Sequence, residues 1–214
     1  MAVDQPDFLD ASQSGQRRIG LTGGIASGKS SVGRLLTESH GCPVLDADGF
    51  AHDALAAGTA AARAVADRYG AAVVQAASPD REAITLDRAA LGRIVFSNAA
   101  ERAWLEQLVH PLVRARFAEA LSQLREQPVV VLMIPLLYEA GLEGLCSEIW
   151  LVDCDEAQQL QRLMARNGLS ESEARTRIAA QWPLARKRPL ATVVLNNRGT
   201  VEALAPQVEA ALFR

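Results

Sequence analysis

The stretch "IGLTGGIASGKSSVGRLL", residues 19–36, decides the fold that the rest of the chain must fit. An apolar run predicts a short buried strand, a glycine-rich turn follows, and residues 30–38 are typical of a helix. The turn holds Gly23-x-x-x-x-Gly28-Lys29-Ser30, a phosphate-binding pattern in the strand–loop–helix context that it requires. Glycines let successive N–H groups point at one anion, and the helix adds its positive N-terminal end. The stretch therefore predicts a nucleotide site.

The use of lysine supports this interpretation. Of the 22 basic residues only two are lysines, Lys29 and Lys187. Lys29 thus stands where a compact point charge is needed, and it is predicted to reach the β- and γ-phosphates of the nucleotide. Ser30 is predicted to offer its hydroxyl to Mg²⁺. The predicted nucleotide-binding residues of the loop are Gly23, Gly24, Ala26, Ser27, Gly28, Lys29, Ser30 and Ser31.

The apolar segments predict an α/β fold with a five-stranded parallel sheet flanked by helices. The predicted strands are 18–22, 42–48, 128–135, 148–154 and 192–197. Between the second and third strands the chain is alanine-rich with helical spacing, and this stretch is too long for a simple crossover. Further helices are expected over 155–166, 170–182 and 201–213, with capping boxes at Asn98-x-x-Glu101 and Ser170-x-x-Glu173.

These elements predict one P-loop domain over residues 17–214, preceded by a disordered leader. The expected divisions are the leader 1–16, a core of 17–48, 128–154 and 190–214, a helical insert of about 49–127, and a lid of about 155–185.

Composition excludes several other classes of protein. The net charge of −3 gives no basic surface for nucleic acid, and no apolar run approaches the roughly 20 residues that cross a bilayer. The acidic, polar N-terminal stretch lacks the features of a signal peptide, so we expect a cytoplasmic protein. The three cysteines lack metal-ligand spacing and are expected to be small buried side chains.

Two acids, Asp46 and Asp48, end the second predicted strand. Side chains two apart on an extended strand share a face, and the carboxyl edge of a parallel sheet lines the ligand crevice. An acid there is expected to accept the proton of a hydroxyl that attacks the γ-phosphate. The alternative is that one acid only caps the helix starting near Gly49. The strand 128–134 ends without the Asp usual in switch ATPases, and no Asn-Lys-x-Asp pattern of GTPases occurs.

Arg162 and Arg166 lie at i and i+4 on one predicted helix, ahead of Asn167-Gly168 and a second capped helix. This layout fits a mobile lid whose arginines neutralise charge on the transferring phosphate and exclude water. The alternative is a solvated helix face.

With these features in place, the chain resembles the dephospho-CoA kinase family from about residue 19 to the last helix. The residues that carry the resemblance are "TGGIASGKS", "VLDAD", His110-Pro111-Leu112, "IPLLYE", "LQRLMAR", Ala180-Gln181 and Asn197-x-Gly199. The resemblance implies a P-loop core, a helical CoA-binding subdomain and a lid. It also implies transfer of the ATP γ-phosphate, with Mg²⁺, to the ribose 3′-hydroxyl of dephospho-CoA, the last step of coenzyme A synthesis.

The resemblance also implies roles for individual residues. Asp48 matches the general base, Asp46 supports the base or the metal shell, and Arg162 and Arg166 match lid arginines that act with Lys29 in catalysis. Asn197 falls near the adenine of ATP. Thr22, Asp46 and His110 are assigned to the acceptor substrate; for His110 a structural role stays open, as it does for Glu139.

Two departures from the family pattern stand out. Ala26 replaces a common glycine, which costs little at negative φ and causes steric strain at positive φ. Thr192 stands where the family tends to have an acid, so we assign it no role. Another small-molecule kinase, for a nucleoside monophosphate or a sugar, and a non-catalytic ATP-binding switch remain the alternative functions.

Overall fold

The computed structural model describes residues 15–75 and 84–214, and the chain divides into two compact units. Unit 1 comprises residues 1–46 and 120–214, and unit 2 comprises residues 47–119. The predicted leader lies outside the described residues except for its end. There Gln16 is buried, and its side chain donates to the carbonyls of Leu124 and Gln127, at 2.7 and 2.9 Å. Gln16 is therefore packed against the segment between α5 and β3.

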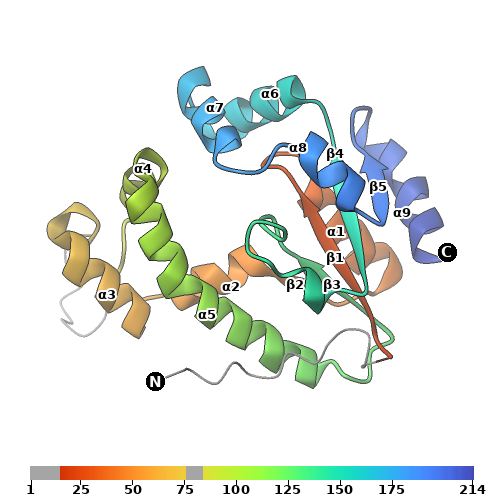
Figure 1. Cartoon of the computed structure of the whole chain (residues 1–214), viewed down its shortest axis with the longest axis horizontal. Coiled ribbons are helices and arrows are strands. Elements are labelled where there is room, and N and C mark those ends of the chain that lie inside the picture. The colour runs from red at the N-terminus through yellow and green to blue at the C-terminus, as the bar shows by residue number, and fades with distance from the viewer. Residues whose placement is uncertain (1–14, 76–83) are drawn as a thin grey trace. The chain divides into compact units, whose positions relative to one another are not determined.

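Unit 1 is built on a five-stranded sheet with the strand order β2-β3-β1-β4-β5, and all pairings are parallel (Figure 1). The prediction of a parallel α/β sheet is confirmed. The strands are β1 (Arg17–Gly23), β2 (Val44–Asp46), β3 (Val129–Met133), β4 (Glu148–Asp153) and β5 (Val193–Asn196). The helices of this unit are α1 (Lys29–His40), α6 (Glu156–Asn167), α7 (Glu171–Ala179), α8 (Leu184–Lys187) and α9 (Ala205–Leu212).

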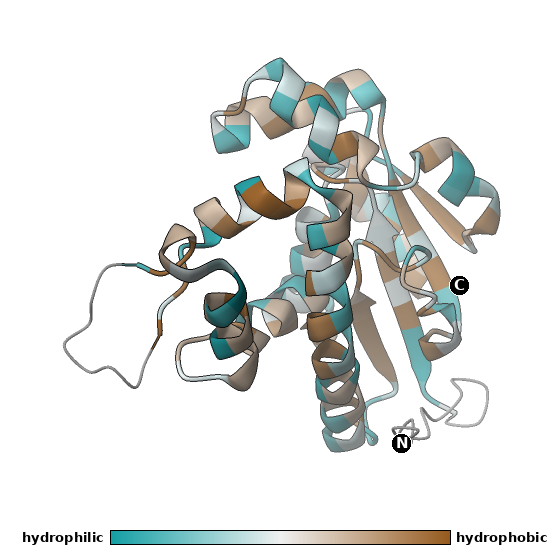
Figure 2. Cartoon of the chain, turned by 60° about the vertical axis from the view of Figure 1, so that its left-hand side comes forward, coloured by the Kyte–Doolittle hydropathy of each residue, from teal (hydrophilic) through white to brown (hydrophobic). Residues whose placement is uncertain are grey.

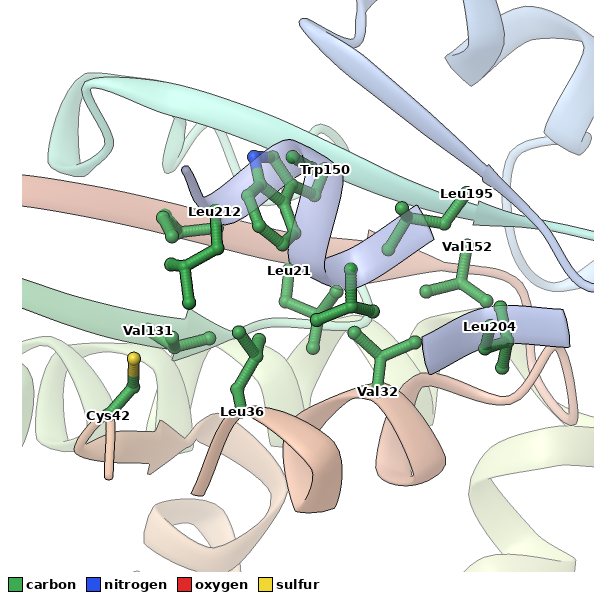
Figure 3. Packing of buried hydrophobic residues seen from close by; sticks show 13 residues of the cluster. Leu21, Val32, Leu36, Cys42, Val131, Trp150, Val152, Leu195, Leu204 and Leu212 are labelled. Carbon is green, nitrogen blue, oxygen red and sulfur yellow. The ribbon is translucent and has the colours of Figure 1, made fainter. Parts of the chain in front are cut away.

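The core of unit 1 lies between the sheet and the pair α1 and α9 (Figure 3). From β1 and β4, Leu21 and Trp150 are fully buried, and Val32 and Leu36 of α1 pack into the same cluster. Burial of apolar side chains stabilises the folded state by roughly 25 cal/mol per Å², so the contacts of Val32 and Leu36 fix the position of α1 on the sheet. It therefore fixes the loop between β1 and α1 as well.

On α7 hydrophilic residues dominate, in contrast to the apolar strand β3, as the colouring in Figure 2 shows. The capping box of α7 forms as predicted. Ser170 Oγ accepts from Glu173 N at 3.3 Å, and the Glu173 carboxylate accepts from Ser170 N at 2.9 Å. In this polar helix the cap supplies stability that an apolar face does not.

Unit 2 is helical, as the spacing predicts. Its elements are α2 (Ala47–Ala54), α3 (Ala60–Tyr69), α4 (Arg88–Ser97) and the long α5 (Ala99–Gln123), whose last residues belong to unit 1. Phe50 of α2 meets Phe117 of α5 edge to face, with 5.0 Å between ring centroids. Aromatic pairs in this geometry add to the burial of apolar area, which helps a small unit to pack.

The capping box predicted at the start of α5 is only half formed. Asn98 Oδ1 accepts from the Ala100 and Glu101 N–H groups, at 2.9 and 3.3 Å. The Glu101 carboxylate instead accepts from Arg68 and from the Tyr69 hydroxyl, at 2.7 and 2.6 Å. A charged guanidinium is a stronger partner than a backbone amide, so the contact with α3 prevails over the local one.

Candidate active site

The glycine-rich loop forms the predicted strand–loop–helix cradle, because β1 ends at Gly23 and α1 begins at Lys29. Gly28, the N-cap of α1, has φ 105°, which side-chain-bearing residues rarely adopt. A Cβ at Gly28 would lie 2.1 Å from Asn197 Nδ2, so this position needs glycine for space as well as for conformation. α1 directly follows the loop, and the N–H groups and positive dipole end of a helix N-terminus suit an anion.

Lys29 lies in this cradle, only 9% exposed, where its Nζ donates to the carbonyls of Gly23 and Gly24 at 3.3 and 2.7 Å. Its positive charge is thus held at the positive end of α1. Ser30 is exposed in the first turn of the helix, whereas Ser27 is fully buried and its Oγ has no hydrogen-bond partner. The arrangement provides backbone N–H donors, one ammonium and one accessible hydroxyl, which suit a polyphosphate with a divalent cation.

The sequence left open whether Ala26 has negative or positive φ, and the structure gives it a φ of 58°. It is the one non-glycine residue with positive φ in the described part of the chain. The departure from glycine is therefore at a position where an L-residue is strained.

The two predicted acids do not lie on one strand, so that expectation is wrong. β2 ends at Asp46, which pairs in register with Met133 at the carboxyl end of the sheet. The backbone becomes helical at Ala47, which places Asp48 in the first turn of α2, where it is exposed. The alternation of an extended strand thus ends before it could align the two side chains.

The two arginines predicted to act in the lid, Arg162 and Arg166, also lie in different surroundings. Arg162 of α6 donates through Nη2 to the Asn197 carbonyl at 3.1 Å, and its buried Nη1 has no hydrogen-bond partner. Arg166 is exposed, and its Nε donates to Asn167 Oδ1 at 2.9 Å. Only Arg162 is therefore joined to the loop through its neighbours.

Asn197, buried after β5, joins the end of the sheet to the loop. Its Nδ2 donates to the Ser27 carbonyl at 2.7 Å and its N–H to the Asp153 carbonyl at 2.7 Å. The buried Oδ1 has no hydrogen-bond partner. The Asn197 side chain thus stabilises the phosphate loop at Ser27.

Of the residues assigned to the acceptor substrate, Thr22 is buried and donates from Oγ1 to the Pro135 carbonyl at 3.2 Å. His110 lies within α5 of unit 2, immediately before Pro111. Burial lowers the pKa of His110 below its usual value, which Glu106 partly opposes, so the neutral imidazole is favoured.

Several polar contacts around the cradle escaped prediction. Lys187 is fully buried, and its Nζ lies 2.8 Å from Glu139 Oε1 and 3.2 Å from the Pro135 carbonyl. Glu139 thus has a structural partner, which agrees with the structural role that the sequence left open for it. Scarcity of lysine, which singled out Lys29, is the signal that could have found Lys187.

Two glutamines also escaped prediction. The Ile25 N–H donates to Gln181 Oε1 at 2.7 Å, and Gln159 Nε2 donates to the Ile25 carbonyl at 2.8 Å. Only Gln181 falls within a motif of the family resemblance.

The described residues contain no group of three or more His, Cys, Asp or Glu side chains that could hold a metal. Mg²⁺ bound with a nucleotide needs only one or two protein oxygens besides phosphate and water. Ser30 and Asp46 fit that requirement in chemistry. None of the helices within 15–75 and 84–214 is long and apolar enough to span a membrane.

A glycine-rich phosphate cradle between a strand and a helix of a parallel sheet defines a P-loop nucleotide-binding protein. The family model described as dephospho-CoA kinase matches residues 17–203 of the chain. The chain belongs to the dephospho-CoA kinase family, whose activity is ATP-dependent phosphoryl transfer in the last step of coenzyme A synthesis.

Individual relatives agree with this family. A dephospho-CoA kinase of Synechococcus sp. (strain CC9605) is 65% identical over 192 residues, which cover 90% of each chain. Among solved structures, TT1252 from Thermus thermophilus is 41% identical with a TM-score of 0.76, over 92% of this chain and 97% of that one. A dephospho-CoA kinase from Campylobacter jejuni, 24% identical, has the same fold with a TM-score of 0.65, over 92% of this chain and 95% of that one.

Proposed function

We propose that this chain transfers the γ-phosphoryl group of ATP to the ribose 3′-hydroxyl of dephospho-CoA, with Mg²⁺ as the metal. The observation that carries the proposal is the cradle: Lys29 is buried at the start of α1, within a chain that matches the dephospho-CoA kinase family from residue 17 to 203. The loop N–H groups and the ammonium would bind the phosphates and stabilise the charge that develops on the transferring group.

The roles of the other residues follow from their chemistry. Ser30 and Asp46 would hold Mg²⁺, which when bound neutralises negative charge on the phosphate oxygens. Arg162 has a free, buried N–H group that can donate to an oxygen of the nucleotide. Asp48 would accept the proton of the 3′-hydroxyl, because it is a solvent-accessible carboxylate next to the end of β2. The helical insert is proposed to bind the acceptor, with His110 as one of its contacts.

A coupled assay of ATP consumption tests the reaction. Consumption should depend on dephospho-CoA and should not occur with AMP, CMP or gluconate, the acceptors of the rival small-molecule kinases. An absence of turnover with dephospho-CoA, from protein that still binds ATP, would leave a nucleotide-binding switch as the better description.

Replacement of Asp48 tests the proposed base. Asp48→Asn should lower kcat by roughly 10²- to 10⁴-fold, because a general base is lost. The rise in melting temperature on addition of ATP should be retained, since the cradle is unchanged. Asp53→Asn is the matched control, because Asp53 is an exposed acid on the same helix, with its side chain 70% exposed. Equal activities of the two variants would remove Asp48 from the role of base.

A further inference from the structure

The main chain of Ile25, at the tip of the phosphate loop, is held on both sides by glutamine side chains. Its N–H donates to Gln181 Oε1 at 2.7 Å, and its carbonyl accepts from Gln159 Nε2 at 2.8 Å. Gln159 belongs to α6 and is 5% exposed, while Gln181 follows α7. We call this pair of side chains the glutamine clamp.

The clamp matches the polarity of the Ile25 main chain group by group. A glutamine amide offers both a donor and an acceptor, whereas a carboxylate offers acceptors only. Ile25 requires an acceptor from Gln181 and a donor from Gln159. Replacing the two glutamines by glutamate therefore has opposite consequences at the two positions.

Gly24 is shaped for this contact. A Cβ at Gly24 would lie 2.1 Å from Gln159 Nε2, so a glycine at this position leaves the space that the Gln159 side chain occupies. The loop has little backbone bonding of its own here; Ser27 N donates to the Gly24 carbonyl at 3.2 Å. Side chains from elsewhere in the sequence supply what the loop lacks.

The residue after the clamp is the strained Ala26, with φ 58°. A non-glycine residue keeps such a conformation only when its surroundings determine it. The bonds to Ile25 fix the peptide that precedes Ala26. They therefore hold the turn that directs the following N–H groups toward a phosphate.

The segment that carries Gln181 is itself anchored within unit 1. The Trp182 N–H donates to Glu139 Oε1 at 2.8 Å, and the same carboxylate pairs with the buried Lys187. The Trp182 ring stacks parallel to that of Tyr138, with 6.4 Å between centroids. The position of Gln181 is thus set by the loop after β3 and not only by its bond to Ile25.

We propose that Gln159 and Gln181 are positioning residues, which hold the phosphate loop in its ATP-binding conformation and join it to the lid helices α6 and α7. The proposal deepens the function given above and rests on it for the identity of the nucleotide. Both side chains also line a cavity of about 580 Å³, with Leu184 and Arg188 among its other walls. This space can receive a swung-out side chain, so substitutions need not overpack the core.

The test compares glutamate at the two positions. In Gln159→Glu a carboxylate would face the Ile25 carbonyl, and the Kd of ATP, measured by calorimetry, should rise roughly 10- to 100-fold because a buried acceptor loses its donor. Gln181→Glu keeps an acceptor for the Ile25 N–H and should bind ATP at least about tenfold more tightly than Gln159→Glu. KM for ATP should follow Kd, while KM for dephospho-CoA should stay the same in both variants.

Controls separate positioning from charge and from folding. Gln161→Glu adds the same charge at an exposed site of α6 and should leave ATP binding unchanged. Gln159→Met and Gln181→Met remove one bond each without adding charge, and both should weaken ATP binding. Equal ATP affinities of the two glutamate variants, or methionine variants that bind ATP like the unaltered chain, would overturn the proposal. Because the primary readout is ATP binding, the outcome stands apart from any failure to phosphorylate dephospho-CoA.

Discussion

Ala26 shows how one residue can store strain in a phosphate loop. At φ 58° an L-residue costs about 1–2 kcal/mol relative to the right-handed region. Glycine would remove this cost, although its greater freedom in the unfolded chain offsets about 0.4–1 kcal/mol. Ala26→Gly should therefore raise the free energy of unfolding by up to about 1.5 kcal/mol, as measured by urea denaturation.

The matched control is Ala165→Gly, at an exposed position within α6. There the same substitution should lower the free energy of unfolding by about 0.5–1 kcal/mol, because glycine weakens a helix interior. A loss of similar size at both positions would contradict the assignment of strain to Ala26.

The two lysines show what the sequence reveals at this scale. Lys29 was predicted because a motif surrounds it, and the structure places it buried in the cradle. Lys187 is the other of the two lysines, and it is even less exposed than Lys29. Its partner Glu139 is 48 residues away in the sequence, however, and no local pattern connects the two. The glutamine clamp was missed for the same reason, since its bonds span 134 and 156 residues.

Among the elements, those with continuous apolar runs were predicted well, because burial on both faces of a sheet leaves a clear pattern. β3 and β4 lie within their predicted ranges. β2 was predicted too long, because "CPVLDAD" does not show where the backbone turns helical. That error placed Asp48 on a strand, whereas the residue lies in the first turn of α2, so its catalytic role stays a proposal while the geometric argument for it fails.

The contact between α3 and α5 predicts a pH dependence of stability. Hydrogen bonds from Arg68 and from Tyr69 lower the pKa of Glu101 from its ordinary value of 4.5 to about 2. A carboxyl group with a depressed folded-state pKa stabilises above its unfolded pKa, and that stabilisation is lost as the pH falls toward the folded pKa. The wild type should therefore melt above Glu101→Gln at pH 6.5, and the difference should shrink as the pH falls below about 4.5.

Melting curves of both proteins between pH 6.5 and 3 measure this difference. In an Arg68→Met background the difference should be smaller at every pH, because the largest cause of the pKa shift is gone. A difference that stays constant with pH would show that the carboxylate contributes no charge-dependent stability.

At the scale of the whole molecule, the chain contains two compact units, and the proposed catalytic groups belong to both. The cradle, Arg162 and Asn197 belong to unit 1, whereas Asp48 and His110 belong to unit 2. The boundary between the two units falls between Asp46 and Ala47, so one proposed acid, Asp46, ends a segment of unit 1 and the other, Asp48, lies near the start of unit 2. We therefore expect ATP to bind first at the cradle of unit 1, and dephospho-CoA to make contacts in unit 2, which contains His110, one of the residues proposed to bind the acceptor.

Hydrogen exchange measured by mass spectrometry tests this division. A non-hydrolysable ATP analogue alone should slow exchange in peptides that cover 23–31 and 155–166, because bound phosphate engages the loop N–H groups and the helices joined to the loop. Dephospho-CoA alone should slow exchange chiefly within 47–119, where α2 and α5 would contact it. Lys29→Ala should abolish the first pattern and retain the second, since the ammonium that binds the phosphates is removed. Protection by dephospho-CoA confined to residues 120–214 would instead place acceptor binding on unit 1, and His110 would then have a structural role.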